Sequence, residues 1–274
     1  MALKFAMLAL AVLVSVASVK AGEDPARETE GDAAGPTLRF TILYDNYLHK
    51  EGTKPDWGFA CLIEGAEKTI LFDTGTKPEI LTHNVETLGV DLKKVDMIVI
   101  THNHGDHTGG LPAALGKKPG IPVFFPASFP SEFGRRVEEL GGEARAVGKP
   151  LEICRNVHLT GELGEAIVEQ SLVIDTPEGL VVVTGCSHPG IVEILRRAGE
   201  IVDKPITLVF GGFHLGNMKD ADVEAIIAAF KEMKVVRCGA THCTGDRPIA
   251  LFKKAFGENF VPIGTGRVIE VPGY

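Results

Sequence analysis

The apolar positions of this chain fall into short runs that end in turn residues. In the first half these runs are rich in β-branched and aromatic residues, which is typical of strands. The predicted strands are LRFTILYDN (38–46), FACLIEG (59–65), KTILFDTG (68–75), DMIVITHNH (96–104) and IPVFFPA (121–127). The segment 80–90 differs, because its apolar residues form one stripe with helical spacing that ends near Gly89. It predicts a helix between two of the strands.

A second series of apolar runs fills the other half of the chain. Its predicted strands are LEICRNVHLTG (151–161), AIVEQSLVIDT (166–176), LVVVTGCSH (180–188), ITLVFGGFH (206–214), VVRCGATHC (235–243) and RVIEV (267–271). Helical patterns at 191–202, 221–233 and 250–256 separate some of them. Tandem strands joined by crossover helices in each half predict two packed sheets with helices on the outside.

The first 21 residues differ from the rest of the chain. A short basic start, Met1–Lys4, precedes an apolar run, and Val19-Lys20-Ala21 offers small residues at the spacing of a cleavage site. We expect residues 1–21 to be a secretory signal peptide, which places the mature protein in the periplasm or outside the cell. An N-terminal helix packed on the core is the alternative. It is disfavoured because residues 22–37 form a polar, acidic, Gly- and Pro-containing linker.

The composition and charge of the chain limit the kinds of partner that it is expected to bind. The chain contains no apolar stretch of about 20 residues, so no integral membrane segment is predicted. Without residues 1–21 the chain holds 26 basic and 36 acidic residues, a formal charge of −10. This balance disfavours nucleic acid and anionic membranes as partners, so a small-molecule substrate is expected. The five cysteines lack a CxxC pair and predict no disulfide framework, although one or two bridges stay open. The sequence does not fix the oligomeric state.

In four places a predicted strand ends in a glycine-containing turn that carries a histidine. The segments are IVITHNHGDH, VVVTGCSHPG, LVFGGFHLG and CGATHCTG. Loops at the ends of parallel strands gather on one edge of a sheet, so these histidines could share one site.

The first of these loops carries the densest set of metal-ligand side chains. His102 and His104 are two apart on an extended segment, so their side chains point the same way and can bind one cation. After the turn at Gly105, Asp106 and His107 lie at the start of a predicted helix and can reach a second cation. Imidazole together with carboxylate is the ligand set of zinc or a similar divalent ion. The loop therefore predicts a metal site.

These residues carry a family resemblance. HNHGDH, with Asp73 in the upstream LFDTG, resembles the HxHxDH and Asp motifs of the metallo-β-lactamase superfamily. GLVVVTGCSHPGI, VFGGFHL and THCTG are similar to the branch that includes archaeal dihydropterin-methyl-aminobenzene-phosphate synthases and many uncharacterised hydrolases. The resemblance covers about residues 38–270. It implies that 38–274 form one α/β domain (α+β in some schemes), a four-layer αββα sandwich with metals along its edge.

The resemblance also implies roles for single residues. One ion is held by His102, His104 and His188, and the other by Asp106, His107 and His242. The expected cofactors are two divalent ions, Zn²⁺ with Mn²⁺ or Fe²⁺ as alternatives. Asp73 is expected to accept a hydrogen bond from a ligand imidazole rather than to touch a metal.

The chain departs from the family pattern at one strand end. Many members place a metal-bridging acidic residue there, whereas this chain has Gly212 in FGGFHL. Water or hydroxide could bridge instead, or His214 could substitute; His214 could equally contact substrate, move a proton or be structural. Cys186 and Cys243 flank ligand positions. Each is either a thiolate ligand or a small buried residue of a strand-end turn.

Two close divalent ions activate a shared water, which predicts hydrolysis of an ester, thioester, lactone or phosphoester. Asp106 is the expected catalytic residue, holding that water in line. No GxSxG, Walker or GxGxxG motif offers a competing chemistry. The alternative is the branch's transferase reaction, joining a dihydropterin-methyl diphosphate to an aminobenzene ribofuranosyl phosphate; the predicted export ranks it second. A further alternative is an exported, non-catalytic metal-binding module. Trp57 either lines the mouth of the site or anchors the first hairpin.

Overall fold

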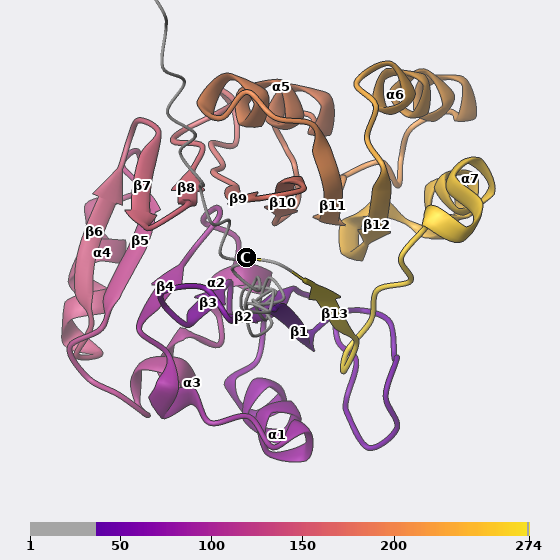
Figure 1. Cartoon of the computed structure of the whole chain (residues 1–274). Coiled ribbons are helices and arrows are strands. Elements are labelled where there is room, and N and C mark those ends of the chain that lie inside the picture. The colour runs from indigo at the N-terminus through magenta and orange to yellow at the C-terminus, as the bar shows by residue number, and fades with distance from the viewer. Residues whose placement is uncertain (1–36, 273) are drawn as a thin grey trace, which may run out of the picture. The chain divides into compact units, whose positions relative to one another are not determined.

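The computed structural model describes residues 37–272 and residue 274. The predicted signal peptide and nearly all of the predicted linker lie outside the described residues. Residues 37–274 form two mixed sheets whose inner faces pack together, with helices on both outer faces (Figure 1). This is the α/β sandwich expected from the sequence. Among the helices that the structure describes, none has the length and apolar character needed to cross a membrane.

The first sheet contains strands from the first half of the chain and the last strand. Its strands are β1 (Leu38–Tyr44), β2 (Ala60–Glu64), β3 (Ile70–Phe72), β4 (Met97–Val99), β5 (Pro122–Pro126), β6 (Glu143–Val147) and β13 (Val268–Val271), in the order β13-β1-β2-β3-β4-β5-β6. Pairing is antiparallel from β13 to β3 and parallel from β3 to β6. Its outer face packs against α1 (Pro78–Leu88), α3 (Leu111–Leu115) and α4 (Ser131–Glu139).

The second sheet contains the remaining strands. These are β7 (Leu151–Cys154), β8 (Val157–Leu159), β9 (Leu172–Thr176), β10 (Gly179–Thr184), β11 (Ile206–Gly212) and β12 (Arg237–Thr241), in the order β12-β11-β10-β9-β8-β7. The strands β10, β11 and β12 are parallel, so their carboxyl ends lie at one edge. Its outer face packs against α5 (Ile191–Ile201), α6 (Asp220–Glu232) and α7 (Asp246–Phe256).

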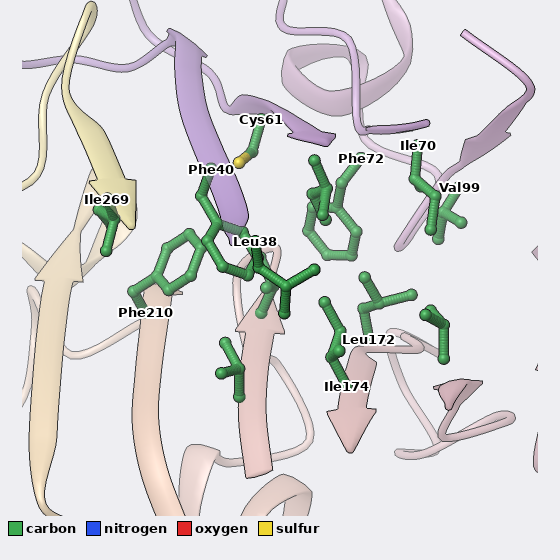
Figure 2. Close-up of a cluster of buried hydrophobic side chains, with 14 of the residues drawn as sticks. Leu38, Phe40, Cys61, Ile70, Phe72, Val99, Leu172, Ile174, Phe210 and Ile269 are labelled. Atoms are coloured by element: carbon green, nitrogen blue, oxygen red, sulfur yellow. The ribbon is translucent and has the colours of Figure 1, made fainter. Parts of the chain in front are cut away.

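The core between the two sheets is a layer of buried aliphatic and aromatic side chains (Figure 2). Phe40 of β1 and Phe210 of β11 meet edge to face, with ring centroids 5.3 Å apart. Both side chains are fully buried, and burial of one such side chain contributes about 1.5–3 kcal/mol. The contact joins one sheet to the other.

Three segments differ from the sequence prediction. The run 151–161 is a hairpin of two strands, because Arg155 and Asn156 form a turn in which Asn156 has a left-handed φ of 62°. The run 166–176 is a strand only from Leu172 onward. The last strand, β13, pairs with β1 in the first sheet. The elements α3, α4 and β6 were not expected from the apolar pattern.

Candidate metal centre

The loop after β4 positions its four ligand-type side chains as the sequence predicts. His104 has extended backbone angles, and the single-turn helix α2 (Gly105–Thr108) begins directly after it. His102 and His104 therefore lie side by side, with Nε2 of His102 3.1 Å from Nδ1 of His104. Asp106 and His107 occupy the first turn of α2 and point toward a neighbouring position, with 3.6 Å between an Asp106 oxygen and Nε2 of His107.

Two loops of the second sheet bring the remaining predicted ligands to this edge. The His188 ring, after β10, lies 4.6 Å from the His102 ring between centroids and 5.0 Å from the His104 ring. His242 begins the short 3₁₀ helix η2 (His242–Thr244) directly after β12, and its Nε2 lies 3.2 Å from an Asp106 oxygen. The structure thus brings all six predicted ligand residues together from both halves of the chain.

The sulfur of Cys186 faces both halves of this cluster. Its Sγ is 3.3 Å from Nε2 of His107. The ligand-type side chains form two sets, and within each set the ligand atoms lie within 4.8 Å of one another. One set contains Asp106, His107, Cys186 and His242, and the other contains His102, Cys186 and His188. Cys186 belongs to both. The acidic residue that the family resemblance places at this strand end has no space at Gly212, where a Cβ would lie 2.5 Å from the Gly185 carbonyl oxygen and 2.7 Å from the sulfur of Cys243. The Cys186 sulfur is therefore the one ligand atom common to both sets among the described residues, and its hydrogen bond with Cys243 together with burial raises the pKa of its thiol well above the ordinary value.

Hydrogen bonds at Nδ1 fix the orientation of four of the imidazoles. The pairs are His102 with Thr101 (2.9 Å), His107 with Asp73 (2.7 Å), His188 with Glu169 (2.9 Å) and His242 with Asn46 (2.9 Å). Each Nδ1–H donates to an oxygen, so each Nε2 is left as a free lone pair, the form that binds metal. The pairing of Asp73 with His107 places Asp73 behind the cluster.

The cluster contains an atom with an unfilled bonding requirement. Nε2 of His242 is buried, and the Asp106 oxygen 3.2 Å away does not meet it with hydrogen-bond geometry. A buried polar atom without a partner is costly, and a bound cation would satisfy this one. Together with the neutral imidazoles, the carboxylate and the thiol, it makes the donor set fit divalent ions of the zinc type.

Burial sets the charge of the histidines. It lowers the pKa of His102 to about 3 and that of His107 to about 4, with neighbouring histidines adding to the effect. Both imidazoles are therefore neutral at pH 7. His242 is different: burial is the largest single effect and opposes its charged form, but its acidic neighbours Asp106, Cys243 and Asp45 together raise its pKa. A metal ion at this position must displace a proton from His242 as pH falls.

Glu169 is a functional residue that the sequence analysis missed. Its buried carboxylate accepts hydrogen bonds from the backbone N–H groups of Cys186 (2.9 Å), Ser187 (2.8 Å) and His188 (2.9 Å), and from the His188 ring. Burial alone would raise its pKa, but these donors and the nearby His102 lower it to about 2. Glu169 thus shapes the GCSH loop. Its one sequence signal is an acid in the apolar segment AIVEQSLVI.

Asn46 was also missed. Its Oδ1 accepts hydrogen bonds from Nδ1 of His242 and from the Gly58 backbone (3.1 Å), while its Nδ2 donates to the His242 carbonyl (3.2 Å). It stands directly after β1, so it connects the end of the first strand to the last predicted ligand. The polar pair Asp45-Asn46 at the end of a buried strand is the signal that could have indicated it.

Strained backbone is concentrated in the site loops. Among the described residues other than glycine, six have positive φ, and four of them belong to this site: Asp73 (55°), Ser187 (65°), His214 (52°) and His242 (51°). Left-handed backbone at such residues costs about 1 kcal/mol or more each, and it persists where the surrounding structure enforces it. The hydrogen bonds described above provide that enforcement.

His214 lies beside the two ligand sets but belongs to neither. Its ring centroid is 4.4 Å from that of His188, and its ligand nitrogen groups with the sulfurs of Cys186 and Cys243 within 4.8 Å. A hydrogen bond with Cys243 raises the pKa of His214, against the effect of burial. All five cysteines are free thiols in the structure.

A cavity of about 640 Å³ opens beside the cluster. His214, His242 and Cys243 form the wall shared with the cluster, and Trp57 lies at the cavity with its ring centroid 5.0 Å from that of His242. Of the two alternatives left by the sequence, Trp57 therefore lines the mouth of the site.

Comparison with known sequences identifies relatives. A family model described as the metallo-beta-lactamase superfamily matches residues 55–196. The chain is 30% identical over 269 residues to the 7,8-dihydropterin-6-methyl-4-(beta-D-ribofuranosyl)-aminobenzene-5'-phosphate synthase of Methanocaldococcus jannaschii, an alignment that covers 79% of this chain and 91% of that protein.

Two solved structures are also similar to this chain. Tm1679, described as a metal-dependent hydrolase of the beta-lactamase superfamily, matches with a TM-score of 0.73 and 29% identity over 85% of this chain and 99% of its own. The metallo-beta-lactamase fold protein YhfI from Bacillus subtilis matches with a TM-score of 0.65 and 15% identity over 86% of this chain and 100% of its own. The second match shows a shared fold alone.

Proposed function

The chain belongs to the metallo-beta-lactamase superfamily, and we propose that it is a metal-dependent enzyme with two divalent ions, Zn²⁺ first, at the edge cluster. The proposed ligands are His102, His104 and His188 for one ion and Asp106, His107 and His242 for the other. The observation that carries this assignment is the orphaned, buried Nε2 of His242. Its Nδ1 is already bonded to Asn46, so Nε2 faces the cluster with its hydrogen-bond requirement unmet.

The reaction we propose is that of a synthase, in which a dihydropterin-methyl diphosphate is joined to an aminobenzene ribofuranosyl phosphate. The amine nitrogen forms a bond to the methylene carbon while the carbon–oxygen bond to diphosphate breaks. The diphosphate leaves with the electron pair, and the nitrogen loses its proton. Two divalent ions supply Lewis acidity toward the oxygens of a leaving group of this kind. The support is the 30% identity to a synthase of this name over 79% of the chain.

This ranking reverses that of the sequence analysis, where the predicted export placed hydrolysis first. The identity to a synthase over 79% of the chain is the stronger argument, and the export test below bears on it, because an exported chain would favour hydrolysis. Hydrolysis stays as the second candidate for two reasons. The Tm1679 structure, similar over 85% of this chain, is described as a hydrolase. The cavity beside the cluster is also lined by no lysine or arginine among the described residues, although a phosphorylated second substrate favours a cationic wall. In a hydrolase, Asp106 would hold the attacking water in line with the scissile bond.

One experiment separates the candidates. The metal content of the purified chain is measured, and the metal-loaded protein is then incubated with both proposed substrates, with each alone, and with a phosphodiester, a lactone, a thioester and a β-lactam. The synthase proposal expects the coupled product by mass spectrometry only when both substrates are present. Hydrolysis of any panel member without coupling establishes the second candidate. Metal binding with no product at all leaves a non-catalytic binding module. His102→Ala is the matched inactive variant for every arm.

We also propose that residues 1–21 direct export to the periplasm or the outside of the cell, that 22–37 are a linker, and that 38–274 form the single enzyme domain. N-terminal sequencing of protein recovered from the producing cell tests this. A mature chain that starts near Gly22 is expected, and one that starts at Met1 contradicts export.

A further inference from the structure

Trp57 is the single tryptophan of the chain, and 56% of its surface is exposed. Its backbone is held at the carbonyl and at the two residues that follow. The Trp57 carbonyl accepts a hydrogen bond from the Thr76 hydroxyl, and the next residue, Gly58, donates to Asn46. The Phe59 N–H bonds to the Asp106 carbonyl at 3.2 Å. The indole is thus carried on a held backbone segment and lines the cavity. A large exposed aromatic beside a cluster of ligand residues marks a binding surface.

The cavity also contains a carboxylate. Asp246, the first residue of α7, lines it, and its Oδ1 accepts a hydrogen bond from the Tyr47 hydroxyl at 2.6 Å. Tyr47 orients the carboxylate, and Oδ2 has no hydrogen bond to a described residue. The neighbouring Arg247 does not line the cavity and pairs instead with Asp220. The cavity wall therefore combines an aromatic face with an acceptor and lacks a Lys or Arg among the described lining residues.

We propose that this cavity binds a flat, uncharged heterocycle with a 2-amino-4-oxopyrimidine edge, the pterin type, stacked on Trp57 with that edge at Asp246. The assignment rests on the synthase proposal and identifies where one substrate lies. An aromatic face attracts a flat ring without regard to charge. The amino group and ring N–H of such a heterocycle are parallel donors, and a carboxylate accepts two parallel donors well.

The same arrangement fixes the direction of the substrate. A phosphate group is disfavoured at Asp246, because two anions would face each other without a cation between them. Trp57 and His242 have ring centroids 5.0 Å apart. A heterocycle stacked on Trp57 therefore lies next to the ligand cluster, and its anionic arm is directed away from Asp246, toward Asp106, His242 and the ions proposed there.

The test uses Trp57 as its own reporter. Metal-loaded protein is titrated with 6-hydroxymethylpterin, and indole fluorescence is followed beside calorimetry. Saturable quenching is expected. Lumazine is the matched probe, because it keeps the two rings and replaces the 2-amino donor by a carbonyl that faces the carboxylate. We expect it to bind at least tenfold more weakly.

Variants assign the two contacts. Asp246→Asn should weaken pterin binding about tenfold and remove the preference for pterin over lumazine. Trp57→Phe should retain binding by calorimetry, whereas Trp57→Ala should lose it. Asp222→Asn, an exposed acid in the first turn of α6, is the control and should bind as wild type. Equal affinity for the two probes in the wild-type protein, or an unchanged Asp246→Asn variant, overturns the proposal.

The experiments distinguish a failure of the subsite proposal from a failure of the synthase proposal. Pterin binding that depends on Asp246, without coupled product in the activity assay, leaves this subsite standing and contradicts the synthase. Coupled product with full activity in Asp246→Asn leaves the synthase standing and contradicts the subsite.

Discussion

Glu169 and His188 are joined twice, because the Glu169 carboxylate accepts hydrogen bonds from the backbone N–H and from the ring Nδ1 of His188, each at 2.9 Å. One buried acid thus fixes both the loop and the imidazole orientation of a proposed ligand. It belongs to the segment before β9, which was expected to be continuous strand. The strand itself begins only at Leu172.

Glu169→Gln should weaken metal binding by about 10- to 100-fold, the usual cost of removing the partner of a ligand histidine. The amide retains one acceptor oxygen, so it cannot accept from all four donors of the GCSH loop. We expect the free energy of unfolding to fall by about 1–3 kcal/mol as well. Metal titration and thermal unfolding measure the two effects. Glu165→Gln, an exposed acid four residues earlier, is the control, and equal losses in both variants would contradict the assignment.

Glu169 also predicts a pH dependence of stability. Its folded pKa of about 2 lies below the ordinary value of 4.5. Its contribution is therefore fully present above pH 4.5 and is lost as pH falls toward 2, and it amounts to about 3 kcal/mol. Urea unfolding of the metal-free chain at several pH values should show the difference between wild type and Glu169→Gln shrinking below pH 4.5. Other titrating groups cancel in that difference. A gap that stays constant down to pH 2.5 would show that the carboxylate charge contributes nothing.

Cys186 should supply a sulfur ligand. Its Sγ belongs to both ligand sets, whereas that of Cys243 groups only with Cys186 and His214. Protein loaded with Co²⁺ is expected to show a sulfur-to-cobalt charge-transfer band in the near ultraviolet. Cys186→Ser should lose the band and Cys243→Ser should keep it. Cys186→Asp should lose the band yet still bind two ions, because a carboxylate is itself a ligand for divalent ions and would replace the sulfur shared by both sets. A band that survives in Cys186→Ser would assign the sulfur to Cys243 or remove it from the site.

The sequence predicted the two-sheet sandwich and the residues that meet at its edge for one physical reason. His102, His188 and His242 each follow a buried apolar strand and lie in or beside a glycine-containing turn, and parallel strands bring such turns to one edge. Glu169 and Asn46 do not follow this pattern. Their importance comes from contacts with residues 19 and 196 positions away. The spacing of residues along the chain does not indicate such contacts, so they become visible only in the folded structure.

Asn46→Ala should selectively weaken the ion at Asp106, His107 and His242. The substitution removes the acceptor at Nδ1 of His242, so this ring can protonate at Nε2 and turn from the ligand position. Metal analysis at limiting free Zn²⁺ should give close to two ions in the wild-type chain and close to one in the variant, with a loss of affinity of about 10- to 100-fold. The remaining ion should still require His102. Asn259→Ala, an exposed amide in η3 (Gly257–Asn259), is the control. Two tightly bound ions in Asn46→Ala would show that His242 holds its orientation without Asn46. Loss of both ions would show that the two positions fill as one unit.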